Sequence, residues 1–444
     1  MKILIINLHS NHNAGDHVLL QVALQQLYAA FPGCTITLAM NDPASYTDPA
    51  RHEQVVASFF AWFKMHKSTT SSARVGHALQ MLWLIFASLI VGLGYRLTGR
   101  TVDGLLPAVY RPTLRAYTEA DLVVSCPGNF IYSRAHNGGV AFLGPFFTIA
   151  YAWLVYKPIH MLPQTIGPLW RAWERGLTRW LLARVRVILL RDPTSVELMQ
   201  TLGIDASRYH LTPDIAFLFE GAPAEAASHF LCCHGIDAQD RPRLGVTLIN
   251  WGEQHPNFRH QARYEQAIAA TIQAFLRAYG GCAVLFPQVC GPTPADDDRI
   301  PARRVAAHLR ALGVETGVVV IEEETPPQLL SAAYGQMDLF LGSRLHSNIF
   351  ALTWHTPVIA IAYQSKTHGV MQMLGLSAWV LDIEAVAAEP LTELVQRIWP
   401  QREQLRSHIQ TQVGVIQLAA NQTGAWLRTD FERLNDERRK TNDP

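Results

Sequence analysis

Short apolar runs alternate with amphipathic stretches along the first half of this chain. The apolar runs predict buried strands over residues 3–8, 35–40, 122–125, 159–162 and 187–190. Helical periodicity lies between them, notably over residues 16–31, 140–156, 170–184 and 194–202. Strands that alternate with helices in this way predict a parallel sheet with helices packed on its faces.

A second series of the same kind follows a break. Residues 220–242 predict a linker, because they combine Gly, Pro and Ala with a polar end. Further strands are predicted at residues 244–250, 283–286, 318–321, 339–341 and 358–361, and a long helical segment at residues 402–434. We expect an α/β chain of two Rossmann-like domains with a central cleft, residues 1–219 and 243–435, and a frayed tail at residues 436–444. Such a cleft is a favoured place for a ligand.

One strand-to-helix turn carries two residues that favour an anion. Arg344 and His346 follow the apolar run that ends at Gly342, where the next helix is predicted to begin. Free N–H groups and the helix dipole attract negative charge at such a place, and a guanidinium and an imidazole add to that attraction. The structural alternative is a surface arginine beside a helix-capping histidine.

Composition narrows the class of protein without defining its activity. The chain has 444 residues, of which 49% are hydrophobic and 16% charged, and its net charge is +1. Two domains are the natural expectation for this length, and the charge balance gives no reason to expect nucleic acid. The six cysteines are scattered without zinc spacing, so we expect free thiols in the cytoplasm. The N-terminus becomes polar too soon for a signal peptide.

An apolar run at residues 79–97 is long enough to be a membrane helix. A single span is awkward, because the strands before and after the run are predicted to share one sheet. Basic residues flank both ends of the run, which suits an anionic membrane surface: Lys64, Lys67, Arg74, Arg96 and Arg100. Three alternatives therefore stay open for this inserted helix: a helix seated in the membrane surface, a buried helix or oligomer contact, and a true span.

Several other motifs follow predicted strands directly. In the segment 11–19, Gly15 would allow a ligand close to the backbone and Asp16 could cap the first helix. The segments 126–130, 162–168 and 191–195 begin with turn residues at other strand ends. Each motif alone is compatible with a simple turn. Their common position at the carboxyl edge of the predicted sheet favours a binding site.

In its motifs the chain resembles the polysaccharide pyruvyl transferase family. The resemblance rests on Asn13-Ala-Gly-Asp16, Pro127-Gly-Asn129, Gln164-Thr-Ile-Gly-Pro168, Leu190-Arg-Asp192 with Ser195, Pro213-Asp214, Ser343-Arg-Leu-His346, and Pro357 to Ile361 with Tyr363 and Lys366. These motifs cover most of the chain, and their order and spacing are more specific than any one of them. The chain departs from the family at the first motif, often Gly-Asn-x-Gly-Asp, where the first Gly is replaced. The apolar run at residues 79–97 is also outside the minimal family pattern.

The resemblance implies a fold of the GT-B type and a defined reaction. Family members move the pyruvyl group of phosphoenolpyruvate onto two hydroxyls of a sugar, which forms a cyclic ketal and releases phosphate. Phosphoenolpyruvate is then a co-substrate, and no cofactor is expected. Donor contacts are implied for Arg191, Arg344 and His346, with the Leu345 backbone beside them, and Lys366 is a further candidate for the phosphate. His346 is the leading candidate for the general acid, because a neighbouring phosphate would favour its protonated form.

On the acceptor side, the candidate residues are Asn13, Gly15, Asp16, Asn129 and Gln164. Asp16 could serve as a base, although a helix cap is an equal alternative. Histidines gather near this motif, but their spacing does not indicate a metal site. The acceptor is expected to be a saccharide of a cell-envelope polysaccharide or its lipid-linked precursor.

Two rival functions stay open beside pyruvyl transfer. One rival is a nucleotide-sugar glycosyltransferase of the same fold, which usually places a carboxylate on the ribose; the first carboxylate after Gly342 is Asp382. The other is a non-catalytic polysaccharide assembly protein. We expect a cytoplasmic enzyme at the inner face of the cell membrane, in peripheral contact through residues 79–97, with a homo-oligomer possible.

Overall fold

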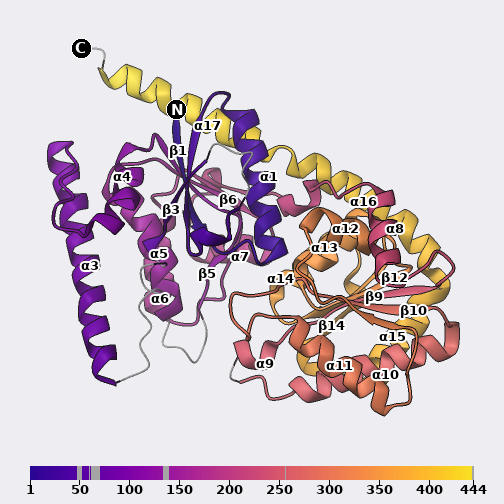
Figure 1. Ribbon diagram of the computed structural model, residues 1–444. Coiled ribbons are helices and arrows are strands. Elements are labelled where there is room, and N and C mark those ends of the chain that lie inside the picture. Colours follow the sequence, from indigo (N-terminus) through magenta and orange to yellow (C-terminus); the bar gives the residue numbers. More distant parts are fainter. Residues whose placement is uncertain (48–52, 60, 62–70, 134–139, 256, 443–444) are drawn as a thin grey trace. The chain divides into compact units, whose positions relative to one another are not determined.

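The computed structural model describes residues 1–444 except 48–52, 60, 62–70, 134–139, 256 and 443–444 (Figure 1). The chain divides into two compact units. Unit 1 contains Met1–Asn11, Leu19–Asp214 and Asn421–Pro444, and unit 2 contains His12–Val18 and Ile215–Ala420. The short segment His12–Val18 therefore belongs with the second half of the chain, although it directly follows the first strand.

Unit 1 is built on a sheet of parallel strands in the order β3-β2-β1-β4-β6-β7-β8, with β5 paired to β6. Parallel strands are buried on both faces, which explains why apolar runs form them. The bounds are β1 Lys2–Leu8, β2 Thr35–Met40, β3 Gln54–Ala57, β4 Leu122–Ser125, β5 Gly128–Ile131, β6 Ile159–Ile166, β7 Val187–Leu190 and β8 Tyr209–Leu211.

Helices cover this sheet (Figure 1). They are α1 Ala14–Ala30, α3 Ser71–Thr98, α4 Arg111–Glu119, α5 Val140–Leu154, α6 Ala172–Leu182, α7 Pro193–Thr201 and α17 Thr423–Asn442. One hydrophobic core joins β1, α3, α4, α5 and α6, and it includes Leu4, Leu84, Leu114, Tyr151 and Leu181. The α3 helix is thus part of the core of unit 1 through one of its faces.

The C-terminal helix α17 is fixed to unit 1 by a buried ion cluster. Asp430 accepts from His160 Nε2 on β6 at 2.8 Å and from Arg186 Nε at 2.9 Å. Burial raises the pKa of Asp430, but these partners outweigh burial and hold it below the ordinary range. Phe431 also packs on Phe31, with ring centroids 5.4 Å apart. The last segment of the chain therefore belongs to the first sheet.

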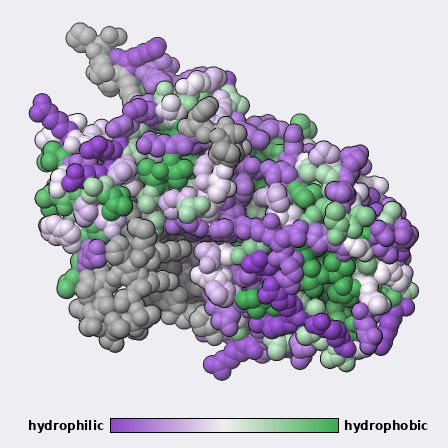
Figure 2. Space-filling view, in the orientation of Figure 1, coloured by the Kyte–Doolittle hydropathy of each residue, from purple (hydrophilic) through white to green (hydrophobic). Residues whose placement is uncertain are grey.

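The outer face of α3 is apolar and exposed. Leu79, Leu82, Trp83, Phe86, Leu89, Ile90, Leu93 and Leu97 are between 41 and 76% exposed, whereas Leu84, Ala87 and Val91 on the other face are buried. Over Leu79–Thr98 the mean hydropathy is 1.6, so by length and composition this helix could cross a membrane. The predicted flanking residues Lys64 and Lys67 lie outside the described residues, and so does the side chain of Arg74. In Figure 2, green apolar side chains appear among polar ones at the left edge of unit 1, where Figure 1 draws α3.

Unit 2 contains a second parallel sheet, in the order β11-β10-β9-β12-β13-β14. Its strands are β9 Arg243–Thr247, β10 Cys282–Phe286, β11 Val318–Val320, β12 Leu339–Gly342, β13 Val358–Ala362 and β14 Val380–Asp382. Its helices are α8 Ala224–Cys233, α9 Trp251–Gln254, α10 Gln261–Tyr279, α11 Arg299–Ala311, α12 Pro327–Gly335, α13 Leu345–Thr353, α14 Ser365–Met373, α15 Ala388–Ile398 and α16 Arg402–Ala420. Because β10 and β12 both pair with β9 in parallel, the loops that follow β10 and β12 emerge at the same edge of the sheet.

The predicted α/β class with two parallel sheets is confirmed, and so are the predicted strands. The structure differs from the predicted domain limits in three places. The predicted linker contains α8, which buries Ala227, Phe230 and Leu231. The predicted C-terminal helical segment is two helices, α16 in unit 2 and α17 in unit 1. The predicted tail at residues 436–444 is helical as far as Asn442.

Four strands, β3, β5, β8 and β14, were not predicted. At β5 the reason is local, because Cys126-Pro-Gly-Asn129 indicates a turn, yet Gly128 and Ile131 pair with β6. The segment after Leu162 was likewise expected to be a turn, whereas β6 continues to Ile166 with every residue buried.

Candidate functional site

Three segments of unit 2 meet at the carboxyl edge of its sheet. The segment His12–Asp16 pairs with the loop after β10, because Ala14 N donates to Gln288 O at 3.2 Å and Cys290 N donates to His12 O at 3.1 Å. Asn13 and Val289 form an antiparallel bridge there. The third segment is the turn Gly342–His346 between β12 and α13, which we call the anion turn.

Gly15 lies against the imidazole of His346 in the anion turn. A Cβ added at Gly15 would lie 2.5 Å from His346 Cγ and 2.8 Å from His346 Cβ, and it would collide with Nδ1 as well. Carbon atoms do not approach this closely, so the histidine occupies the space that any side chain at position 15 would need. The absence of a side chain at Gly15 is therefore required for this histidine position.

Asn13 caps the first helix. Its Oδ1 accepts from the N–H of Gly15 at 3.0 Å and from that of Asp16 at 3.4 Å, and its Nδ2 donates to Asp16 Oδ2 at 3.1 Å. The expectation that Asp16 itself caps the helix was wrong, because α1 begins at Ala14 and Asp16 lies within its first turn. The partly buried Asp16 therefore directly follows Gly15, which contacts His346.

Arg344 is held by a buried carboxylate that the sequence did not indicate. Its Nη2 donates to Asp298 Oδ1 at 2.5 Å, and its Nε lies 3.2 Å from both oxygens. Asp298 is buried and also accepts from the N–H of Val289 at 3.0 Å. One edge of the Arg344 guanidinium, formed by Nε and Nη2, is thus fixed, which leaves Nη1 as the donor that can turn to a ligand.

Burial raises the pKa of Asp298 to about 6, although Arg344 and the backbone N–H groups of Val289 and Gln288 oppose the rise. For Arg344, burial would lower the pKa, but the charge of Asp298 outweighs burial and raises it. The guanidinium therefore stays charged, and the ion pair is complete only above the pKa of Asp298.

Lys366 supplies a second positive charge in this region, and both Lys366 and Arg344 act on the phenol of Tyr363. Burial would raise the pKa of Tyr363, but the charges of Lys366 and Arg344 outweigh burial and lower it. Lys366 Nζ lies 5.5 Å from the Tyr363 ring centroid, and the Trp251 ring packs on the same tyrosine at 4.7 Å. The predicted residues Arg344 and Lys366 are therefore both electrostatic neighbours of one phenol in unit 2.

Polar contacts below the anion turn fix its backbone. Tyr264 Oη and Ser343 Oγ are 2.6 Å apart, and Thr247 Oγ1 and Ser347 Oγ are 2.7 Å apart. Ser347 also donates to the carbonyl of Arg344 at 2.8 Å. Leu345 is buried and begins α13, so the first N–H groups of this helix lie at the turn.

Arg191 lies in unit 1, at the carboxyl end of β7. Its side chain is only 2% exposed, with Nη1 donating to Asp214 at 2.6 Å and Nε to Thr165 Oγ1 at 2.9 Å. Asp192 next to it caps α7 by accepting from Ser195 N at 2.8 Å. The predicted donor ligand is thus also a buried structural residue of this sheet.

The predicted acceptor residues Asn129 and Gln164 also lie in unit 1, on the paired strands β5 and β6. Gln164 is buried and its Nε2 donates to the carbonyl of Cys126. Asn129 Oδ1 and Gln164 Oε1 are buried acceptors for which the described residues supply no donor. The predicted site residues therefore fall into two groups, one in each unit. Asn13, Gly15, Asp16, Arg344, Leu345, His346 and Lys366 belong to unit 2, and Arg191, Asn129 and Gln164 to unit 1.

Within the described ranges, no group of three or more His, Cys, Asp or Glu side chains is arranged to hold a metal ion. Asp298 is the site residue that sequence reasoning missed. The one signal for it was the run Asp296-Asp297-Asp298 in the loop after β10.

Solved structures with the same architecture place the chain in the GT-B-like class. UDP-GlcNAc 2-epimerase from Neisseria meningitidis bound to UDP-GlcNAc is 11% identical, with a TM-score of 0.57 over 97% of this chain and 100% of that one. Sucrose-phosphate synthase from Thermosynechococcus elongatus is 12% identical, with a TM-score of 0.57 over 98% and 100%. At such low identity the likeness shows the fold alone.

The chain belongs to the polysaccharide pyruvyl transferase family, whose sequence profile matches residues 13–365. It is also 24% identical over 420 residues to the amylovoran biosynthesis protein AmsJ of Erwinia amylovora, a match that covers 92% of this chain and 94% of that protein. The predicted family is confirmed. The protein is a transferase that acts in polysaccharide modification.

Proposed function

We propose that this enzyme transfers the pyruvyl group of phosphoenolpyruvate to two hydroxyls of a sugar in a cell-surface polysaccharide or its lipid-linked precursor. The observation that carries the proposal is the anion turn, where Arg344 and His346 lie at the start of α13 and Gly15 packs on the histidine. A ligand with both phosphate and carboxylate matches a guanidinium, an imidazole, a helix N-terminus and a nearby lysine.

In this proposal Arg344 binds the donor through the nitrogen that Asp298 does not hold. A fork fixed on one side loses little freedom when a ligand binds its other side, so the contact is preorganised. Lys366 supplies a second positive charge for the phosphate. The carboxylate nearest to Arg344 is already engaged by it, which disfavours the rival function in which a free carboxylate binds a ribose.

The reaction needs one proton donor and one proton acceptor. His346 donates a proton to the methylene carbon of the donor, and the adjacent carbon then accepts the first sugar hydroxyl. The C–O bond to phosphate breaks, and the second hydroxyl closes the ketal. The two hydroxyl protons balance the reaction: one ends on the new methyl group through His346, and the other leaves with hydrogen phosphate. Asp16 is our candidate base, because it is only partly buried and lies on the helix that contacts His346 through Gly15.

We assign Asn129 and Gln164 to acceptor recognition, because buried amide oxygens can accept from sugar hydroxyls. The assignment is supported by Asn129 Oδ1 and Gln164 Oε1, which are buried and accept no hydrogen bond from the described residues. Arg191 remains a donor contact in the proposal, through Nη2, while Asp214 and Thr165 hold its other nitrogens.

The proposal places the enzyme at the inner face of a membrane, where a lipid-linked acceptor would be presented. The exposed apolar face of α3 supports this location, since soluble monomers rarely expose contiguous apolar stripes of this length. The other face of α3 is in the core of unit 1, which favours peripheral contact over a span.

The proposal is tested by incubating the enzyme with phosphoenolpyruvate and a panel of lipid-linked or soluble saccharides, then measuring phosphate release and the mass of the acceptor. We expect one equivalent of phosphate for each acceptor that gains a pyruvyl ketal. His346→Ala should lower the rate of transfer by at least about 100-fold while weakening donor binding much less. Transfer of a sugar from a nucleotide donor, with no use of phosphoenolpyruvate, would favour the rival glycosyltransferase.

A further inference from the structure

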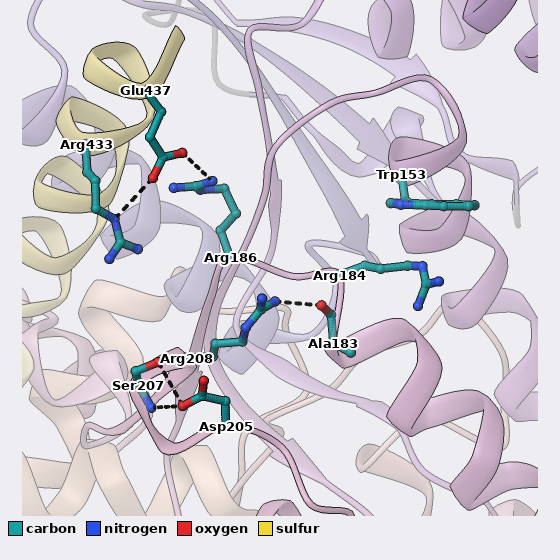
Figure 3. A pocket seen from close by; sticks show the side chains of 9 residues that line it. All are labelled: Trp153, Ala183, Arg184, Arg186, Asp205, Ser207, Arg208, Arg433 and Glu437. Carbon is teal, nitrogen blue, oxygen red and sulfur yellow. Dashed lines mark hydrogen bonds and ion pairs between the residues drawn. The ribbon is translucent and has the colours of Figure 1, made fainter. Parts of the chain in front are cut away.

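A basic pocket lies in unit 1, lined by none of the residues that we assign to donor or acceptor binding. Its volume is about 450 Å³, and it is lined by Trp153, Ala183, Arg184, Arg186, Asp205, Ser207, Arg208, Arg433 and Glu437 (Figure 3). Residues 183–186 precede β7 and residues 205–208 precede β8. The pocket is therefore at the amino edge of the sheet, opposite the edge where β6 ends at Ile166 and β7 at Leu190.

Four arginines face two carboxylates in this lining, and they are not equally engaged. Arg186 is held by Asp430 and by Glu437, whose Oε2 lies 3.2 Å from its Nη1, and Arg433 binds Asp430 at 2.6 Å. Arg184 and Arg208 instead donate to backbone carbonyls, those of Trp180 at 2.7 Å and Ala183 at 2.6 Å. Neither forms an ion pair with a carboxylate in the part of the chain that the structure describes.

The carbonyl contacts of Arg184 and Arg208 are those of a cap at the end of α6, and each uses one nitrogen. A guanidinium has five N–H donors, so both retain donors for a ligand. Asp205 is occupied by the N–H and hydroxyl of Ser207, each at 2.9 Å. Two partly exposed positive charges thus remain available at the pocket.

Trp153 connects this pocket to the apolar face of α3. The Arg184 guanidinium lies 4.9 Å from the Trp153 ring centroid, and Arg96 at the end of α3 lies 4.7 Å from the same ring. Arg96 also stacks on the exposed ring of Tyr156 at 3.9 Å. An exposed apolar helix that ends in a group of arginines and aromatic rings has the chemistry of a membrane–water boundary.

We propose that this pocket binds the phosphate of an anionic lipid headgroup when α3 lies on the membrane surface. Apolar side chains of α3 then enter the interface, Arg96, Trp153 and Tyr156 lie at the headgroup level, and Arg184 and Arg208 bind phosphate. Between Leu79 and Leu97 the helix carries no acidic residue, so nothing on this face repels an anionic bilayer. The inference rests on the proposed membrane contact of α3 and goes beyond it in lipid selectivity.

The test is flotation of the full chain with vesicles of phosphatidylcholine alone and with vesicles that also contain phosphatidylglycerol. We expect wild type to prefer the anionic vesicles. Arg184→Gln with Arg208→Gln should bind these vesicles about 30-fold more weakly and neutral vesicles as before, because each arginine near an anionic surface contributes to binding. Arg277→Gln with Arg310→Gln is the matched control, since it removes two exposed charges from unit 2. An undiminished anionic preference in the first variant, or an equal loss in the control, overturns the proposal.

Two more measurements separate the charge of the arginines from their carbonyl contacts, and a lipid phosphate from a soluble one. Arg184→Lys with Arg208→Lys loses the same guanidinium contacts and keeps the charges, so most of the preference for anionic vesicles should remain. Loss of that preference, without unfolding, would mean that the effect of the glutamine variant comes from the lost carbonyl contacts and not from the lost charges.

Calorimetry with soluble glycerol 3-phosphate addresses the second source of phosphate. Tight binding of that probe without any effect of the glutamine variant on vesicles would make this a site for a soluble ligand and overturn the lipid assignment.

The outcome is separable from that of the proposed reaction. Pyruvyl transfer to a water-soluble acceptor should be unchanged in the glutamine variant, because the pocket lies at the other edge of the sheet. Failure of wild type to use phosphoenolpyruvate would refute the reaction and leave the vesicle result standing. Failure of wild type to bind either kind of vesicle would refute both membrane proposals and leave the reaction untouched.

Discussion

Gly15 and His346 are in direct contact, so the first motif of the chain and the anion turn form one structural feature. A side chain at position 15 would overlap the imidazole, with its Cβ 2.5 Å from His346 Cγ. The segment that carries Gly15 is held from its other side by the loop after β10. The histidine that we propose as the acid thus has its position limited by residues from the start of the chain.

Gly15→Ala should therefore displace the imidazole without unfolding unit 2. We expect transfer to fall by at least about tenfold, and the free energy of unfolding to fall by about 1–3 kcal/mol because of overpacking. Gly414→Ala in α16 is the control, since nothing lies within 4 Å of its added Cβ. That control should leave activity unchanged and stabilise its helix slightly. Wild-type activity in Gly15→Ala would mean that His346 can move aside without consequence.

Asp298 gives the enzyme a predicted dependence on pH. Its carboxylate must be ionised to hold Arg344, and its pKa is raised to about 6, so kcat/KM should fall as the pH falls through this value. The stability effect has the opposite sign. Since the pKa is higher in the folded than in the unfolded chain, ionised Asp298 disfavours folding above about pH 6, and that cost disappears as the pH falls towards about 4.

Asp298→Asn should remove this acidic limb and leave a low activity that depends less on pH, measured as kcat/KM against pH. Asp297→Asn is the neighbouring control, because Asp297 pairs with Arg299 instead, with 2.8 Å between the charged groups. We expect the control to keep the wild-type profile. An unchanged acidic limb in Asp298→Asn would assign that limb to another group.

The fold was largely predictable because parallel strands are buried on both faces. Residues 122–125 and 187–190 are continuous apolar runs, and they coincide with β4 and β7. The missed strands are short and lack this signature: β8 and β14 have three residues each, and none of them is fully buried. The membership of residues 421–444 in unit 1 was also hidden, because it depends on an ion pair between Asp430 and the distant His160.

The site residues that could be predicted are likewise those with a local sequence signal, and the missed ones depend on contacts between distant segments. Arg344 and His346 follow a recognisable strand, so their position at a helix start can be derived locally. Asp298 is 46 residues away from Arg344 in sequence, and their contact follows from the strand order β10-β9-β12, which alternation of strands and helices does not reveal. The contact of Gly15 with His346 was hidden for a similar reason, since a segment next to β1 belongs to the other unit.

Arg191 offers a test that separates support from ligand binding. Arg191→Met removes the buried guanidinium that pairs with Asp214, which should lower the free energy of unfolding by about 3–5 kcal/mol in denaturant titrations. Adding Asp214→Leu removes the buried negative charge as well, so most of the stability should return. If Arg191 also contacts the donor, as we propose, affinity for phosphoenolpyruvate should stay low in the double variant. Affinity that recovers together with stability would make Arg191 a structural residue only.

The last prediction concerns the exposed apolar face of α3. Leu82→Glu with Phe86→Glu places two charges on the apolar stripe while the buried Leu84 and Ala87 stay unchanged, so unit 1 should remain folded. Because burial of this stripe in the interface is worth about 25 cal/mol per Å², we expect the variant to leave the membrane fraction of a lysate for the soluble fraction. Activity on a water-soluble acceptor should persist, since the substituted side chains lie on the outer face of the helix. Val415→Glu with Leu418→Glu, two exposed apolar positions of α16, is the control and should stay with the membranes. A variant that remains membrane-bound would contradict the membrane role of the stripe. A variant that changes its oligomeric state, while wild type never binds vesicles, would assign the stripe to contact between copies of the chain.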